Sequence, residues 1–192
     1  MPATSPATAS SALPLGRQSW VIQLTTVLLA SAVLTLSAKV KVPFYPVDMT
    51  MQPLAVLGLG LLLGSRLAVA TVLVYLAQGA AGLPVFTGTP EKGIGLAYMM
   101  GPTAGYLVGF VLAAAATGWA ADRGWTRGLV GALGASAVGL VLIYTPGVAY
   151  LASLLGFEKA VQFGLAPFWL KDVVAAVLAA VASTAVLAAA RR

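Results

Sequence analysis

Four polar side chains interrupt otherwise apolar stretches of the chain, and their types suit ligand binding rather than covalent chemistry. Gln52 stands just before Pro53 at the start of one apolar run, and Gln78 lies inside another. Lys171 and Asp172 follow the apolar residues APFWL. Ionisable groups within apolar membrane segments are candidates for function by default. Amide, carboxylate and ammonium groups in apolar surroundings suit a pocket for a small neutral or anionic organic molecule.

Hydroxyl and lysine side chains gather on the same side of the expected structure and extend this candidate site. They are Thr50, Lys92, Tyr98, Thr103 and Tyr144. Cations and hydroxyl groups of this kind can hold a carboxylate. Two glycine- and proline-containing stretches, GLPVF at 82–86 and GPTAGYLVGF at 101–110, should end helices and enclose a loop beside the pocket.

Catalytic and metal-binding patterns are missing from the sequence. It contains no histidine, no cysteine and only five acidic residues, which are widely spaced. We therefore expect neither an enzyme nor a bound metal or cofactor. There is no P-loop pattern either, so any uphill transport must draw its energy from an ion gradient or another chain. The net charge of +6 includes no basic run beyond Arg191-Arg192, and we expect no nucleic-acid partner.

The composition is that of an integral membrane protein. Of the 192 residues, 60% are hydrophobic and 8% are charged, whereas soluble domains carry about 25% charged residues. A helix of about 20 apolar residues spans the bilayer core. On this basis we predict an all-α protein in the lipid bilayer with six transmembrane helices, at 19–38, 53–63, 67–81, 101–121, 127–153 and 168–189.

The division between the second and third helices rests on the residues GSR at 64–66. One long helix would bury Arg66 in the bilayer, which is costly, so we predict two short helices that turn there. Basic residues slightly favour a topology with both termini inside. Residues 1–16, rich in Ser, Thr, Pro and Ala, are expected to be a disordered cytoplasmic tail, and residues 17–192 a single six-helix domain.

The first predicted helix carries small residues at helical spacing. Ala30, Ser31 and Thr35 would let another helix approach closely in lipid, and we expect them to dock a partner subunit. Similar residues on other helices are interpreted as packing within the chain.

Four segments resemble the BioY family, the biotin-specific S components of energy-coupling-factor vitamin transporters. They are TMQPLAVL at 50–57, LLLG at 61–64, VYLAQGAAGLPVF at 74–86 and GPTAGYLVGF at 101–110, and the similarity extends over roughly residues 40 to 190. The resemblance implies an S-component fold in the bacterial cytoplasmic membrane that captures biotin from outside. It also implies a transmembrane T component and two cytoplasmic ATPase subunits as partners.

The resemblance implies roles for the polar residues as well. Asp172 would accept from the ureido ring of biotin, Gln52 or Gln78 would donate to it, and Lys171, Lys92, Tyr98 or Thr103 would hold the carboxylate. The lysine that the family pattern places three residues after this aspartate is Ala175 here. Alternatives to a biotin S component are an S component for another vitamin, a membrane enzyme such as a lipid-modifying transferase, and a structural subunit.

Overall fold

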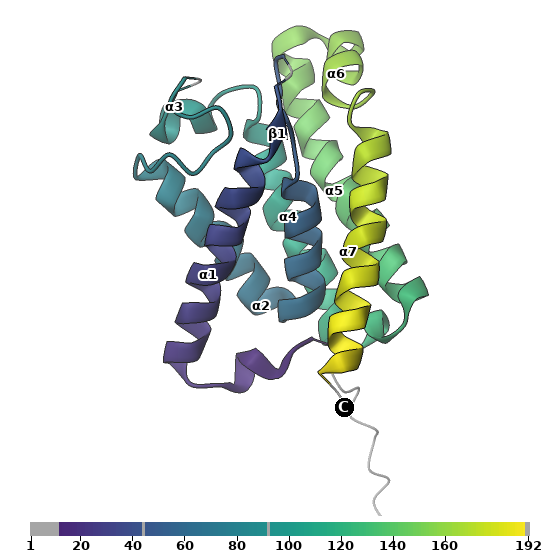
Figure 1. The fold of residues 1–192 in the computed structure, drawn as a ribbon. Helices are drawn as coiled ribbons and strands as arrows, with labels where there is room; N and C mark the ends of the chain where they lie inside the picture. The colour runs from purple at the N-terminus through teal and green to yellow at the C-terminus, as the bar shows by residue number, and fades with distance from the viewer. Residues whose placement is uncertain (1–11, 44, 92, 191–192) are drawn as a thin grey trace, which may run out of the picture.

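The computed structural model describes residues 12–43, 45–91 and 93–190, and they form a helical bundle (Figure 1). The α-helices are α1 (Trp20–Lys39), α2 (Gln52–Ala80), α3 (Gly95–Met99), α4 (Ala104–Asp122), α5 (Leu129–Leu155), α6 (Phe157–Gly164) and α7 (Trp169–Ala189). Short 3-10 helices occupy Pro14–Arg17 (η1) and Trp125–Arg127 (η2). Five helices, namely α1, α2, α4, α5 and α7, have the length and hydropathy to cross a bilayer.

The count of six helices differs from the seven α-helices in the described residues. Two predicted loops contain the short helices α3 and α6, and the predicted second and third helices together form α2. The chain is also not purely helical, because strands β1 (Lys41–Val42) and β2 (Met49–Thr50) pair antiparallel in a small hairpin. These short elements satisfy backbone groups of the connecting segments by local hydrogen bonds, which hydropathy alone does not reveal.

The predicted turn at 64–66 exists as a sharp break within α2. Gly64 has φ 77° and ψ 171°, a conformation that is essentially restricted to glycine. The backbone N–H of Ser65, freed by the break, donates to Asp122 Oδ2 at 3.0 Å, and the Ser65 hydroxyl donates to the same oxygen. After the break α2 returns alongside itself, since Gln52 Nε2 donates to the Tyr75 hydroxyl at 2.8 Å.

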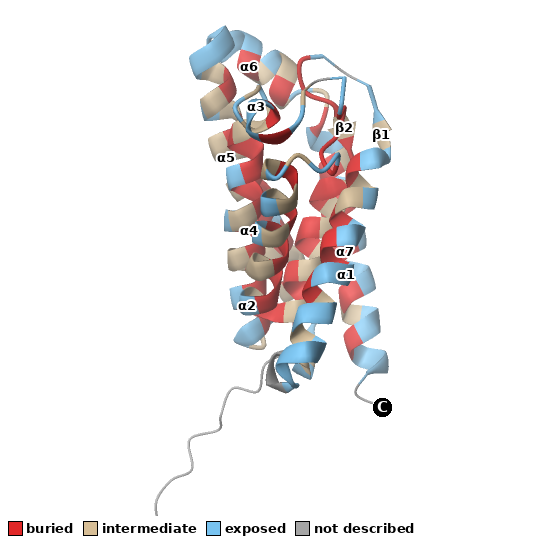
Figure 2. Cartoon of the chain, turned by 90° about the vertical axis from the view of Figure 1, so that its left-hand side faces the viewer, coloured by how far each residue is buried: buried red, intermediate tan, exposed pale blue. Residues whose placement is uncertain are grey.

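The two arms of α2 lie at the centre of the bundle and pack against α1, α4 and α7. Buried residues line the inner faces of the helices along their full length (Figure 2). Small residues permit close contacts: a Cβ on Gly105 of α4 would lie 2.1 Å from the carbonyl oxygen of Pro146 on α5. The same face-to-face packing between α4 and α5 continues toward η2.

The small residues of α1 face the interior, which corrects their expected role in docking a partner. Ala30 and Ser31 are 6% and 1% exposed, and Ser31 Oγ accepts a hydrogen bond from Gln78 Nε2 on α2. Thr35 is half-buried and donates to the carbonyl of Ser31. Their small size lets α1 pack closely on α2 within the chain.

The amino-terminal segment contacts the bundle from an earlier residue in the sequence than predicted. The backbone N–H of Leu13 donates to the carbonyl of Leu62 at 2.8 Å, and η1 begins at Pro14, within the predicted tail. Residues 1–11 of that tail lie outside the described residues. The beginning of α1, the bend of α2 and the end of α7 all lie at one end of the bundle, and the β-hairpin, α3 and α6 lie at the other (Figure 1).

We predict that Gly64→Ala destabilises the bundle by about 1–3 kcal/mol, because alanine has a Cβ that this backbone conformation does not accommodate. Unfolding of purified protein by SDS in mixed micelles measures the effect. Gly58→Ala is the matched control: it lies in the same helix, its added Cβ meets nothing within 4 Å, and it should be neutral or slightly stabilising. If Gly64→Ala and Gly58→Ala were equally stable, the backbone strain assigned to an alanine at position 64 would be contradicted.

Candidate ligand-binding site

A cavity opens among the helix ends beside the β-hairpin, at the end of the bundle opposite the start of α1 and the end of α7. About 560 Å³ of space between atoms lies within it, part of which is open to solvent. Residues from β2, α2, α4, α5, α7 and the segment after α2 line it. Polar groups are few among mostly apolar and aromatic walls, the composition expected for an organic ligand.

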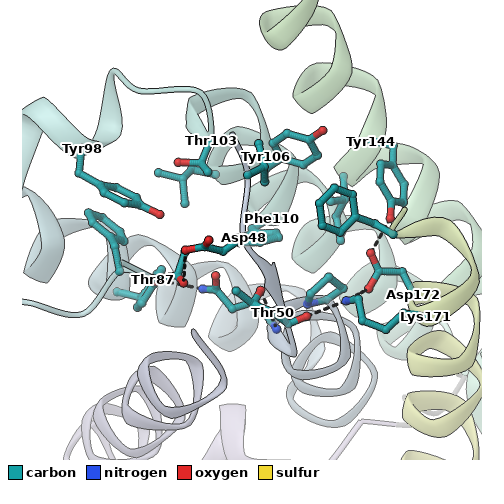
Figure 3. A pocket seen from close by; sticks show the side chains of 18 residues that line it. Asp48, Thr50, Thr87, Tyr98, Thr103, Tyr106, Phe110, Tyr144, Lys171 and Asp172 are labelled. Carbon is teal, nitrogen blue, oxygen red and sulfur yellow. Dashed lines mark hydrogen bonds and ion pairs between the residues drawn. The ribbon is translucent and has the colours of Figure 1, made fainter. Parts of the chain in front are cut away.

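One end of the cavity holds an ion pair at the start of α7. Lys171 Nζ forms a salt bridge with Asp172 Oδ1 and donates to the carbonyl of Thr50 at 2.6 Å. The hydroxyl of Tyr144 on α5 donates to Asp172 Oδ2 at 2.5 Å. The Asp172 side chain is 6% exposed, so its charge is compensated by these two partners instead of by water. Figure 3 shows this group together beside the cavity.

The other end is formed by a second carboxylate and several hydroxyl groups. Asp48, whose side chain is 1% exposed, pairs with Lys41 at 3.4 Å and accepts from the Thr87 hydroxyl at 3.3 Å. Tyr98 and Thr103 project toward Asp48 from the opposite wall (Figure 3). This end therefore offers both hydrogen-bond donors and acceptors to a ligand.

Aromatic side chains form most of the apolar wall between the two ends. Phe86 stacks on Tyr98 with ring centroids 4.7 Å apart, and Tyr75 meets Phe86 edge-on at 5.4 Å. Tyr106 and Tyr144 form a further edge-on pair at 6.3 Å. Gln52 reaches this wall from the first turn of α2, where its side-chain amide donates to Tyr75. Such pairs keep flat surfaces at fixed positions around the cavity.

Tyr98 lies on the short helix α3, outside the candidate membrane spans, and remains a hydrogen-bond donor at physiological pH. Burial raises the pKa of its phenol to about 12, and the nearby charge of Asp48 acts in the same direction, against the effect of a hydrogen bond with Thr103. The phenol is therefore protonated throughout the range in which cells live.

The segment after α2 covers one side of the cavity and is attached to α1. Lys39 Nζ donates to the carbonyl of Phe86 at 2.8 Å and to the Thr89 hydroxyl at 3.1 Å. Thr89 in turn donates to the carbonyl of Phe86. These bonds hold Phe86 and Thr87, both of which line the cavity, in place. This arrangement agrees with the predicted loop between the two glycine- and proline-containing stretches.

The structure brings together seven of the nine predicted ligand-binding residues. Those that line the cavity are Thr50, Gln52, Tyr98, Thr103, Tyr144, Lys171 and Asp172. Gln78 lies elsewhere: its amide donates to Ser31 at the contact between α1 and α2, so it was wrongly placed in the pocket. Lys92 lies outside the described residues. Ala175 is 2% exposed and is not among the lining residues, so it faces the core of the bundle.

Sequence reasoning missed several lining residues. The clearest is Asp48, which looked like an ordinary loop acid but is buried against the hairpin. Its position one residue before a hairpin strand, in a segment flanked by apolar residues, was the available signal. The aromatic residues Tyr75, Phe86, Tyr106, Phe110 and Phe168 were also missed, because aromatic residues of a membrane protein ordinarily face lipid or the core.

The fold and the cavity together define an integral membrane protein with a partly polar, aromatic-walled cavity near one end of its helical bundle. The BioY family matches residues 7–192 of the chain. A probable biotin transporter BioY of Pyrococcus horikoshii is 36% identical over 159 residues, which cover 83% of this chain and 92% of that protein. The biotin transporter BioY of Rhizobium etli is 40% identical over 153 residues, or 75% and 80% of the two chains.

This chain belongs to the BioY family, as the resemblance of its four segments predicted. Its fold is also that of a solved structure, the S-component for biotin from an ECF-type ABC transporter. The TM-score is 0.72 at 22% identity, and the match covers 91% of this chain and 94% of the other. The S-component fold that was predicted from sequence is therefore confirmed.

We predict that Tyr75→Phe destabilises the protein by about 1–3 kcal/mol, because it leaves the buried Gln52 amide without its acceptor. The double variant Gln52→Leu/Tyr75→Phe should lose less stability than Tyr75→Phe alone, since no side-chain amide is then left without its acceptor. SDS unfolding in mixed micelles measures both. Tyr150→Phe, which removes a hydroxyl that bonds the Met100 carbonyl in a more exposed position, is the control. Additive losses would show that the two side chains act independently.

Proposed function

We propose that this protein is the substrate-capture subunit of an ECF-type transporter and binds biotin in the cavity between α2, α4, α5 and α7. The observation that carries the proposal is the joint placement of seven predicted ligand-binding residues around one cavity in a member of the BioY family. The relatives named as biotin transporters support the choice of ligand.

The ion-pair end of the cavity matches the ureido ring. A ureido group has two N–H donors on either side of a carbonyl acceptor. Asp172 accepts from Lys171 and Tyr144 and retains further lone pairs for a ligand N–H. Lys171 donates to Asp172 and to the carbonyl of Thr50, and an ammonium has three donors, so one remains for the ureido carbonyl. The adjacent acceptor and donor are thus complementary to the ring.

The opposite end then receives the carboxylate of the ligand. Tyr98 and Thr103 present hydroxyl groups there, and the Tyr98 phenol stays protonated as a donor. Lys41 compensates the charge of Asp48 at this end, which lowers the cost of bringing in a second carboxylate. The aromatic residues between the two ends would enclose the thioether ring and the aliphatic chain.

A transmembrane T component and two cytoplasmic ATPase subunits are the proposed partners. The sequence has no phosphate-binding loop, so the chain itself has no recognisable means of using ATP. A partner would contact a surface other than Ala30 and Ser31, because both are buried within the chain. The exposed apolar face of α1, which includes Leu29, Val33 and Leu36, is available to it.

The proposed membrane topology has six passes in the bacterial cytoplasmic membrane with both termini in the cytoplasm. The bend at Gly64 supports it, because each arm of α2 then counts as one pass, and the start of α1 and the end of α7 lie at the same end of the bundle. Arg66 and Arg123 lie at that end, as the excess of basic residues on cytoplasmic sides requires. The cavity consequently faces outward.

Three other functions are weaker. An S component for another vitamin would have the same fold, since one fold serves many ligands. A membrane enzyme would need a reactive group or metal in the cavity, and the described residues contain no cluster of three or more His, Cys, Asp or Glu side chains. A purely structural subunit would not require two ion pairs beside a cavity of this size.

We expect purified protein to bind radiolabelled biotin, with no competition from thiamine or riboflavin. Asp172→Asn and Lys171→Ala should each weaken binding by about ten- to a hundredfold, because each removes a charge-assisted hydrogen bond to the ureido ring. Glu158→Gln, an exposed acid on α6, should bind like the parent. If Asp172→Asn bound biotin as tightly as the parent, the assignment of Asp172 to the ureido ring would be wrong. Displacement of bound biotin by thiamine or riboflavin would point to another vitamin.

The natural absence of cysteine permits a direct test of topology. Glu158→Cys, at the cavity end, should react with a membrane-impermeant maleimide in intact cells. Arg66→Cys, at the bend of α2, should react only after the membrane is permeabilised. Labelling of Arg66→Cys in intact cells would reverse the proposed orientation without affecting the ligand assignment.

A further inference from the structure

An apolar groove lies between α4 and α5 at the end of the bundle opposite the cavity. It holds about 410 Å³ and is lined by alanine, glycine and valine residues together with two tryptophans: Ala116, Trp119, Ala120, Trp125, Gly134 and Val138 are among its residues. Because α4 and α5 are both long and apolar enough to cross a bilayer, the groove runs along the hydrocarbon region. Nothing in the proposed biotin site uses it.

Gly134 leaves open space in the groove. A Cβ added to Gly134 would meet no atom within 4 Å, whereas one added to Gly131 would lie 1.8 Å from the carbonyl oxygen of Trp125. Packing within the chain therefore explains Gly131 but not Gly134. Glycine destabilises the interior of a helix relative to alanine. Its presence here keeps the groove deep.

The end of the groove carries positive charge at a fixed position. The guanidinium of Arg123 stacks over the Trp119 ring, with Cζ 4.0 Å from the centroid, and Trp119 meets Trp125 edge-on at 4.9 Å. The two indoles are 42% and 59% exposed, as is usual for tryptophan at the boundary between hydrocarbon and headgroups.

The nearby acid does not neutralise Arg123. Asp122 is turned toward α2, where Oδ2 accepts both hydrogen bonds from Ser65, and no carboxylate in the described part of the chain pairs with Arg123. A guanidinium that is stacked on a ring by one face keeps its N–H edges free to bind a planar or tetrahedral anion. The groove thus combines a hydrocarbon-lined channel with an anion-binding end at headgroup level.

We propose that this groove binds an anionic phospholipid, with an acyl chain along Gly134 and Val138 and the headgroup phosphate at Arg123. The positive charge at the end of the groove favours this ligand over a zwitterionic lipid, because Arg123 would repel the cation of a zwitterionic headgroup. It also favours a lipid over an apolar helix of a second copy, which would leave the guanidinium without an anion.

Native mass spectrometry of the purified chain tests the proposal, with phosphatidylglycerol and phosphatidylcholine of identical acyl chains as probes. The parent should bind phosphatidylglycerol at least fivefold more tightly than phosphatidylcholine. Arg123→Gln should reduce this preference by about fivefold, and its matched control Arg66→Gln, an exposed arginine at the same end of the bundle, should retain it. Equal binding of the two lipids by the parent would overturn the proposal.

A second variant tests the hydrocarbon half of the site independently, so that a folding failure in one variant leaves the other decisive. Gly134→Leu should fill the groove and weaken both lipids, while Gly58→Leu, whose added Cβ also meets nothing within 4 Å, should not. Unchanged lipid binding by Gly134→Leu would contradict the assignment. If the parent instead appears as a dimer that Gly134→Leu dissociates, the occupant is a second copy of the chain and the lipid proposal fails.

Discussion

The hydrogen bonds from Ser65 to Asp122 hold together the part of the structure on which everything else depends. A break in a helix frees backbone groups that need other hydrogen-bond partners. Asp122 accepts from the backbone N–H and the hydroxyl of Ser65, so α2 can bend at Gly64 without leaving that donor unpaired. Because of this bend, Gln52 comes back beside Tyr75 and the β-hairpin meets the ends of α4, α5 and α7.

The cavity is held open by polar contacts between elements that are distant in the sequence. Lys171 on α7 donates to the carbonyl of Thr50 before α2, and Lys39 on α1 donates to the carbonyl of Phe86. Each ammonium satisfies a backbone carbonyl that secondary structure leaves unpaired. The same groups that order the connecting segments thus shape the wall of the site, and the two buried carboxylates, Asp48 and Asp172, each have a lysine partner.

The two ends of the bundle are specialised differently. The end with the cavity collects hydroxyl groups, carboxylates and stacked aromatic rings on short elements that pack over the helix ends. The other end presents tryptophan and arginine around an apolar groove. In the described part of the chain the charged residues lie at helix ends, at the bend of α2 or in the short connecting elements, where water, headgroups or ligands compensate the charge.

The sequence by itself determined the membrane character, the approximate helix positions, the break near Gly64, the family and most of the polar site residues. Those features follow from local hydropathy, from the backbone needs of glycine and proline and from the cost of isolated charges in lipid. Only the tertiary structure decided which face of each helix points inward. It buried Ala30 and Ser31 within the chain, paired Gln78 with Ser31 instead of a ligand, and brought Asp48 into the cavity. In a chain this apolar both faces of a helix look alike, because lipid and protein interior favour the same residues, so contacts between distant segments are what distinguish them.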